Sequence, residues 1–426
     1  MHSLSLAGVV ISGVLAVAAF AFGAEPVGGT AVAKTVTLRV VDESGVKVPG
    51  PLHMPNSRNG WNPGDPAWRF EMVAGSTPPA WTYRVDLSKL PDGDGGIEFK
   101  FARGAWGMVE VSAEGNDVDN RVLEFKALRE AAGTTVELAS IKGYADQRGT
   151  RWPHMSAPGA EQRSTVTGTV EVHDFNSKVL KNTRKVRVWL PEGYSARGNE
   201  GERYPVLYML DGQNSFDVVG SAIGVEWRCD EAATELIKAG KIDPMIIVAI
   251  DNIGDVRAEE YNPPYTSYLN KQNRGDQHLR FITDEVMPFV NETYRTKTGR
   301  EHTGIGGSSF GGNATLYAVM ERPDVFGRAI VESAAVFLDN RAIVRRAEGA
   351  DRWPIRMFMA VGTAETARSG DAKAFADMNR ELMSALRLKG LGEDRLMTVV
   401  EEGGKHSEGV WAKRFPAALG FVFGKE

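Results

Sequence analysis

The feature that most constrains the fold of this chain is a glycine-rich pentad, residues 307–311, with Ser309 at its centre. A β-prone stretch precedes the pentad, and a helical pattern over residues 314–321 follows it. A G-x-S-x-G motif between a strand and a helix predicts a sharp turn that lifts the serine hydroxyl clear of the backbone. Glycine suits positions 307 and 311 because a side chain there would collide with the neighbouring strand or helix. We therefore predict Ser309 as a nucleophile at a helix N-terminus, where free N–H groups can bind an oxyanion.

Two residues downstream of the pentad complete a catalytic pattern. The chain has 47 glycines, so the pentad alone could also be an ordinary glycine-rich loop. Glu365 and His406 each follow a strand-like run, however, and the order serine, acid, histidine is that of α/β-hydrolases. We predict His406 as the base and Glu365 as the acid that holds it, with Asp371 as the alternative acid. The plain alternatives are a surface-loop histidine and a solvated carboxylate.

An oxyanion formed at this serine needs N–H donors. The first is predicted to be the amide of Phe310, the residue after the nucleophile. The second should come from the loop after the apolar run 204–210, where Gly212 and Gln213 are candidates and Gln213 is preferred. Both donors belong to the backbone, so most side-chain substitutions would leave them in place.

Residues 166–426 are predicted to form an α/β-hydrolase domain with a mostly parallel central sheet. Strand-like runs alternate with helical patterns, which indicates βαβ units. The run 204–210 is almost continuously apolar, as expected of a strand buried on both faces of a parallel sheet. The other expected strands are 168–173, 184–190, 245–250, 329–333, 356–361 and 395–400, and the expected helices are 231–238, 277–290, 314–321, 372–388 and 408–423. A site should form where the carboxyl ends of these strands meet.

Residues 35–140 are predicted to form a separate, small all-β sandwich. Short strand-like runs recur about every ten residues with turn residues between them, as in known sandwiches. These runs are 35–41, 80–87, 96–102, 108–113, 122–125 and 134–138. Residues 141–165 contain glycines and prolines without periodicity, so we predict that they link the two domains.

Four tryptophans lie in the first domain, and at least two are expected to pack in its core or at its edges. The segments 59–63 (NGWNP), 79–81 (PAW) and 96–104 (GIEFKFARG), with Trp106, resemble the starch-binding type of carbohydrate-binding module. The resemblance covers the first third of the chain. It implies that Trp61, Trp81 and Trp106 are the candidates for stacking on a sugar, although such modules also occur as non-binding structural domains.

The N-terminus carries an export pattern. Residues 4–22 are apolar with small residues interspersed and precede the first acidic residue, Glu25, which predicts a signal peptide over residues 1–24. No lysine or arginine precedes the run, so an uncleaved N-terminal anchor is the alternative. The expected location is secreted or periplasmic, with no stable membrane span after cleavage.

Composition excludes several other classes of protein. The net charge of −5 gives no basic footprint for nucleic acid. The single cysteine, Cys229, forbids an intrachain disulfide and fits a small buried side chain better than a nucleophile. The seven histidines are scattered without metal-binding spacing, so neither a metal nor another cofactor is predicted.

An ordered set of segments in the second domain resembles the esterase family related to esterase D, which includes enterobactin-type siderophore esterases, feruloyl esterase domains and mycolyltransferases. The segments are 208–214 (YMLDGQN), 257–261 (RAEEY), 307–312 (GSSFGG), 362–365 (GTAE), and His406 with Trp411. The resemblance implies an α/β-hydrolase with Ser309 as nucleophile, His406 as base and Glu365 at the family's acid position.

The same resemblance implies which residues line the substrate side: Asn214, Arg257, Tyr261 and Trp411. Their structural alternatives are an Arg257–Glu260 ion pair and a core tryptophan at 411.

We predict a secreted serine esterase that acts through an acyl-enzyme on an ester of a carbohydrate, phenolic or siderophore-type substrate. The expected partner is a small-molecule or polysaccharide-linked ester. One alternative is acyl transfer to a sugar or lipid acceptor. The other is a carbohydrate-binding protein with a silent hydrolase domain. The intact order of serine, acid and histidine favours the enzyme.

Overall fold

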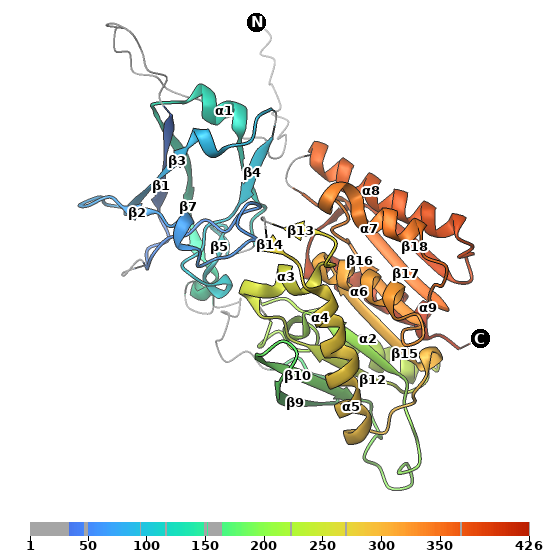
Figure 1. Cartoon of the computed structure of the whole chain (residues 1–426). Helices are drawn as coiled ribbons and strands as arrows, with labels where there is room; N and C mark the ends of the chain where they lie inside the picture. Colours follow the sequence, from blue (N-terminus) through green and yellow to red (C-terminus); the bar gives the residue numbers. More distant parts are fainter. Residues whose placement is uncertain are drawn as a thin grey trace, which may run out of the picture.

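The computed structural model of this chain describes residues 34–46, 50–93, 95–115, 117–148, 151, 164–221, 224–268, 271–366 and 369–425. Figure 1 shows a smaller, β-rich unit from the first third of the chain beside a larger α/β unit. The predicted signal peptide, residues 1–24, lies outside the described residues. None of the helices in the described part is long and apolar enough to cross a membrane.

The first domain is built on a four-stranded sheet in the order β2-β3-β1-β7. β1 (Thr35–Asp42) alternates half-buried and buried residues, as its alternating sequence predicts. It pairs antiparallel with β3 (Ala80–Asp86) and parallel with β7 (Thr135–Ile141). The remaining strands are β2 (Glu71–Met72), β4 (Gly96–Phe99), β5 (Glu110–Val111), β6 (Arg121–Glu124) and β8 (Gly143–Tyr144). β4 pairs with β6 and β5 with β8, and a single apolar core joins β4 and β6 to the sheet.

Two details of the first domain differ from the sequence prediction. A short helix, α1 (Phe125–Glu130), follows β6 and buries Phe125 and Leu128 in the domain core. The start of the predicted linker is structured, because β8 pairs with β5 and is followed by a 3₁₀ turn, η4 (Ala145–Gln147). The pairing partner lies more than thirty residues away, so local composition did not reveal it.

The second domain contains an eight-stranded sheet in the order β18-β17-β16-β15-β11-β12-β10-β9. Its strands are β9 (Thr169–Asn176), β10 (Thr183–Leu190), β11 (Val206–Leu210), β12 (Ile246–Ile250), β15 (Thr303–Ser308), β16 (Arg328–Glu332), β17 (Arg356–Ala364) and β18 (Leu396–Lys405). β9 and β10 are antiparallel additions at one edge, and all other neighbours are parallel. The predicted α/β-hydrolase fold with a mostly parallel sheet is confirmed.

Helices cover both faces of this sheet. The strand period of two sends Tyr208 and Leu210 into one apolar core and Leu207 and Met209 into another. The helices are α2 (Cys229–Lys238), α3 (Arg257–Tyr261), α4 (Gly275–Arg280), α5 (Met287–Thr293), α6 (Phe310–Glu321), α7 (Leu338–Glu348), α8 (Ser369–Leu388) and α9 (Glu408–Phe423). The expected helix over 277–290 is present within a continuous helical stretch over residues 275–293, formed by α4, a π-helical segment over Phe281–Val286, and α5.

Short elements complete the chain. A small hairpin joins β13 (Ser267–Tyr268) to β14 (Lys271–Gln272). The other 3₁₀ turns are η1 (Pro66–Trp68), η2 (Leu87–Lys89), η3 (Trp106–Met108), η5 (Gly212–Asn214), η6 (Gly254–Val256) and η8 (Arg300–His302). η5 follows β11 directly, at the same edge of the sheet as the turn after β15.

Candidate active site

Ser309 occupies the turn between β15 and α6. Its φ of 58° and ψ of −122° are rarely adopted by residues with a side chain, which is the strain expected of a nucleophile elbow. A Cβ atom at Gly307 would lie 2.9 Å from the backbone of Gly311, so only glycine fits position 307. Position 311 is less crowded, since a Cβ there would lie 3.3 Å from an oxygen of Asp211. The predicted turn is present, and close packing explains its first glycine.

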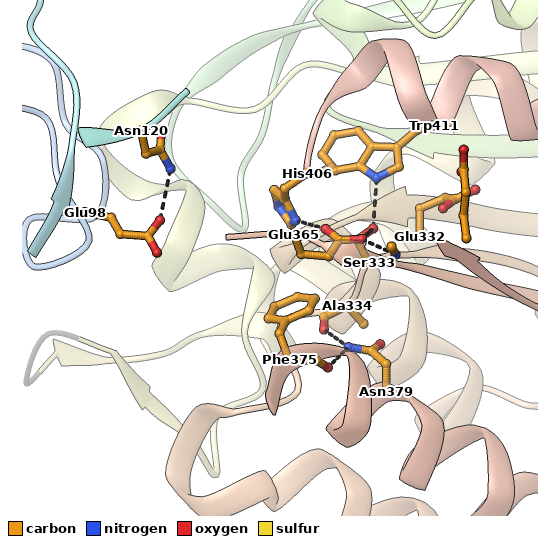
Figure 2. Close-up of polar contacts among 12 residues, drawn as sticks. Glu98, Asn120, Glu332, Ser333, Ala334, Glu365, Phe375, Asn379, His406 and Trp411 are labelled. Atoms are coloured by element: carbon orange, nitrogen blue, oxygen red, sulfur yellow. Dashed lines mark hydrogen bonds and ion pairs between the residues drawn. The ribbon is translucent and has the colours of Figure 1, made fainter. Parts of the chain in front are cut away.

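His406 and Glu365 meet at the carboxyl ends of neighbouring strands. His406 follows β18, Glu365 follows β17, and the His406 Nδ1 atom lies 2.6 Å from a Glu365 carboxylate oxygen (Figure 2). Ser309 follows β15 at the same edge, two strands from β17 and three strands from β18. No hydrogen bond joins the Ser309 hydroxyl to the His406 ring among the described residues, and such bonds often tighten only when substrate binds. The alternative acid, Asp371, lies in the first turn of α8.

Glu365 is held on several sides. Its Oε1 atom accepts hydrogen bonds from the Ser333 hydroxyl at 2.7 Å and from the Gly362 amide at 2.5 Å. Burial by itself raises the pKa of Glu365, but the hydrogen bonds from His406, Ser333 and Gly362 outweigh burial and lower the pKa below its usual value. Glu365 is therefore ionised at neutral pH, as is required of a group that orients and stabilises an imidazolium.

Two aromatic rings fix the plane of the His406 ring. Trp411 and Phe375 approach it edge to face, with centroid distances of 5.0 Å and 5.8 Å. The Trp411 indole N–H also donates to the Ser333 hydroxyl at 3.0 Å (Figure 2). The sequence prediction missed Ser333, whose role depends on a left-handed φ of 47° directly after β16.

Among the described residues, no acceptor is found for the backbone amides of Phe310 and Gln213, the two predicted oxyanion donors. Phe310 opens α6, and Gln213 lies in the first turn of η5, so neither N–H has a partner within its own helix. Gly212 packs so tightly on β12 that a Cβ atom would lie 2.5 Å from the backbone of Ile250. Asp211 precedes it in a left-handed conformation, with φ of 58°. This turn brings the loop after β11 to the edge that carries Ser309.

A partly buried ion pair contacts the loop after β11, residues 211–214, which is named the oxyanion loop here because it carries the predicted donor Gln213. The Arg257 guanidinium forms two hydrogen bonds of 2.7 Å to the Asp211 carboxylate. The Asn252 amide donates to the same carboxylate at 2.6 Å, and the Asp211 backbone N–H donates to the Tyr261 hydroxyl at 3.1 Å. Bidentate pairs of this kind fix orientation as well as charge.

Comparison with known proteins identifies the family of this chain. The sequence profile of the family described as "Putative esterase" matches residues 177–422, more than half of the chain. The chain belongs to this esterase family. It is a carboxylic ester hydrolase, as the sequence analysis predicted.

Three similar proteins illustrate the range of the esterase's relatives. The uncharacterized protein YbbA of Bacillus subtilis (strain 168) is 23% identical over 252 residues, 57% of this chain and 93% of its own. The iron(III) enterobactin esterase of Dickeya dadantii (strain 3937) is 26% identical over 241 residues, half of each chain. The endo-1,4-beta-xylanase/feruloyl esterase of Xylanibacter ruminicola is 26% identical over 171 residues, 38% of this chain and 21% of its own.

The four residues predicted to line the substrate side of the esterase have largely buried side chains. Tyr261 and Trp411 are 0% and 4% exposed, so their predicted substrate contact is corrected. Tyr261 instead accepts a hydrogen bond from the Asp211 amide, and Trp411 donates to Ser333 and packs edge to face on the His406 ring. Asn214 is also buried, and its amide donates to Glu408 at 3.2 Å. Arg257 retains 24% side-chain exposure and pairs with Asp211 rather than Glu260. For Asn214 and Arg257, substrate contact stays a prediction.

The three candidate tryptophans of the first domain differ in exposure. Trp81 is 4% exposed in the domain core, so its ring offers no face to a sugar, and the prediction for Trp81 was wrong. Strand periodicity did not reveal which face of β3 would be buried. Trp61 and Trp106 are half-buried. Their loops lie next to each other: a Cβ atom added at Gly64, near Trp61, would lie only 3.2 Å from the carbonyl oxygen of Gly104, near Trp106.

The first domain contacts the esterase domain next to the candidate catalytic residues. Lys405, which precedes His406, forms an ion pair of 2.7 Å with Asp119. On β13, the Tyr268 hydroxyl lies 3.5 Å from the Ser57 carbonyl, and its ring lies 5.0 Å from that of Phe310. Asn120, adjacent to Asp119, donates to Glu98 at 3.1 Å, and Figure 2 draws this pair beside the His406 site.

Proposed function

We propose that this esterase is a serine hydrolase in which Ser309 forms an acyl-enzyme and His406, oriented by Glu365, is the acid and base. The observation that carries the proposal is the 2.6 Å contact between His406 and the ionised, buried Glu365, at the strand edge where Ser309 stands in a strained elbow. A serine hydroxyl becomes nucleophilic only with such an oriented base.

In the proposed reaction, the Ser309 hydroxyl attacks the ester carbonyl carbon and passes its proton to the free nitrogen of His406. The oxyanion accepts hydrogen bonds from the Phe310 and Gln213 amides. His406 then gives the proton to the departing alcohol. A water molecule, deprotonated by His406, hydrolyses the acyl-enzyme and restores Ser309.

The proposed substrates are esters of a phenolic, siderophore-type or carbohydrate-linked acid or alcohol. Support comes from relatives named as an enterobactin esterase and a feruloyl esterase, and from the first domain beside the active-site edge. Trp61 and Trp106 remain the proposed sugar-stacking residues of that domain. We also propose export through the signal peptide at residues 1–24, which N-terminal sequencing of the secreted protein would test.

The test is hydrolysis of a panel of aryl and acyl esters by the full chain and by Ser309→Ala, with fluorophosphonate labelling in parallel. We expect labelling at Ser309 and loss of nearly all turnover in the variant. Its unfolding curve should match the parent's. Retained hydrolysis of p-nitrophenyl acetate by a folded Ser309→Ala protein would refute the proposal.

A further inference from the structure

Three carboxylates lie close together at the start of α2, and none of them belongs to the candidate catalytic residues. They belong to Glu226, Asp230 and Glu231, and one oxygen of each lies within 4.8 Å of the other two. Glu226 and Asp230 are buried, with 6% and 0% of their surfaces exposed. Such a group of like charges is unfavourable in the interior unless something neutralises it.

Each carboxylate is anchored through one oxygen. Glu226 accepts from the Thr165 hydroxyl at 2.5 Å, Asp230 from the Thr167 amide at 2.5 Å, and Glu231 from Arg228 at 3.1 Å. Arg228 is largely exposed, with 62% of its side chain accessible. The anchors leave the orientation of all three groups fixed.

The second oxygen of each carboxylate is buried without any hydrogen-bond partner in the described structure: Oε2 of Glu226, Oδ1 of Asp230 and Oε2 of Glu231. Buried polar atoms without partners are rare in folded proteins, and a bound ion is one way in which they are satisfied. Three such atoms, one from each member of the group, point to a shared ligand with positive charge.

We propose that Glu226, Asp230 and Glu231 bind a divalent cation of the calcium type. Calcium takes oxygen ligands at about 2.3–2.6 Å, so ligands on opposite sides of the ion lie about 4.6–5.2 Å apart, which accommodates the observed spacing. Calcium also tolerates irregular geometry and water in the remaining positions, whereas magnesium demands a near-ideal octahedron.

The ion would fasten two distant segments together. Thr165 and Thr167 lead into β9, and the carboxylates belong to the loop before α2 and to its first turn. The backbone N–H groups of Trp227 and Cys229 donate to the carbonyls of Asn214, the last residue of η5, and of Ser215, the residue after it. The site is therefore a structural clamp beside the oxyanion loop, with no ligand drawn from the candidate catalytic residues.

Protons could compete with the ion. Burial raises the pKa of Glu226 to about 7 and that of Asp230 to about 8, so the carboxylates can also neutralise themselves by protonation. A direct binding measurement at pH 7.5 distinguishes ion binding from protonation.

The experiment uses the full chain, stripped of metal with a chelator and titrated with calcium alone. We expect one calcium ion per chain by calorimetry, and a rise of about 5 °C in Tm at saturating calcium. Terbium, a calcium substitute, should luminesce when Trp227 is excited. Asp230→Asn and Glu226→Gln should each weaken calcium binding at least about tenfold and abolish the Tm shift, as a lost carboxylate ligand predicts.

Glu235→Gln, an exposed position on the same helix, is the matched control and should bind calcium like the parent. The proposal is overturned if the parent takes up no calcium at about 1 mM, the affinity of weak protein sites. It is equally overturned if Asp230→Asn and Glu226→Gln fold but keep the parent's affinity, or if only magnesium or manganese binds.

Discussion

Two groups of buried carboxylates in the esterase domain differ in what faces them. At the strand edge, Asp211 meets Arg257 and Glu365 meets His406, each at hydrogen-bond distance. At the start of α2, three carboxylates face one another, and within the described structure only Glu231 forms an ion pair. In the first group each carboxylate has a partner of its own, whereas in the second a single arginine, Arg228, faces one of three carboxylates.

The difference between the two groups suits the first to a catalytic role and the second to a structural one. A partner on the protein itself fixes the orientation of a carboxylate and leaves it able to support a reacting group, as the proposed reaction requires of Glu365. Carboxylates that face one another repel, and a bound cation removes this repulsion. Ion binding therefore stabilises the folded state without taking part in the reaction. Substitutions in the first group should therefore change turnover, and those in the second should change ion-dependent stability.

The largest expected effect comes from removing the Ser309 hydroxyl, the proposed nucleophile. Ser309→Ala should lower kcat by at least about 10⁴-fold, because no other group can form the acyl-enzyme. Stopped-flow and steady-state hydrolysis measure turnover, and urea unfolding checks the fold. Calcium binding at α2 should remain unchanged. Turnover within about tenfold of the parent's would contradict the catalytic role proposed for Ser309 and for the first group of carboxylates.

Neutralising one paired carboxylate should have the next largest effect. Glu365→Gln keeps a hydrogen-bond acceptor for His406 but loses the charge that stabilises its imidazolium, so kcat should fall about 10²–10⁴-fold. Asp371→Asn is the matched control for the alternative acid and should retain turnover. The reverse result in kinetic assays would transfer the acid role to Asp371.

Breaking the Arg257–Asp211 ion pair should lower both the stability of the fold and the rate of hydrolysis. Arg257→Met leaves the buried Asp211 without its cation, which should cost about 3 kcal/mol of unfolding free energy. Displacement of the Gln213 amide should lower kcat about 100-fold. Arg187→Met is the matched control, because Arg187 forms a similar two-bond pair with Asp251. It should lose stability to urea but keep most of its turnover.

The lowered pKa of Glu365 predicts a pH-dependent contribution to stability. A depressed folded-state pKa stabilises the fold above the unfolded value near 4.5, and this contribution is lost as pH falls through the folded value. The difference in unfolding free energy between the parent and Glu365→Gln should therefore be largest near neutral pH and shrink below about pH 4. Urea titrations from pH 7 to pH 3 measure it. A difference that grows in acid would contradict the pairing.

The smallest effect is expected in the second group. Asp230→Asn keeps an acceptor for the Thr167 amide and removes one of three repelling charges, so Tm in calcium-free buffer should stay within about 2 °C of the parent's or rise. Differential scanning calorimetry with a chelator present tests this. A fall of more than about 5 °C would mean that the group is already compensated without an ion.

Much of the esterase domain was predictable because buried parallel strands leave clear signatures. β11 and β12 are fully buried and read as continuous apolar runs, and the Ser309 elbow lies between a strand and a helix. α7 was not predicted, since three residues at its start, Asp339 to Arg341, have left-handed backbone angles and the helix is strongly polar.

The sites were less predictable where they depend on tertiary contact. Glu226 and Asp230 have no metal-binding spacing in sequence, and their anchors, Thr165 and Thr167, come some sixty residues earlier. The positioning role of Tyr261 likewise depends on a hydrogen bond to a residue fifty positions away. Family resemblance located Tyr261 and Trp411 near the site but did not indicate that their side chains were buried.

The Lys405–Asp119 ion pair has a consequence for how this enzyme can diversify. Because His406 is the next residue along the chain, the small domain borders the proposed reaction centre without supplying any strand of the sheet that carries it. We therefore expect loop changes around Asp119 to alter which substrates reach Ser309, while the strands that carry the candidate catalytic residues stay unchanged. We expect an excised hydrolase half to differ from the full chain in its choice of substrate, because Lys405 would lack its counter-charge and Tyr268 would lose its contact with Ser57.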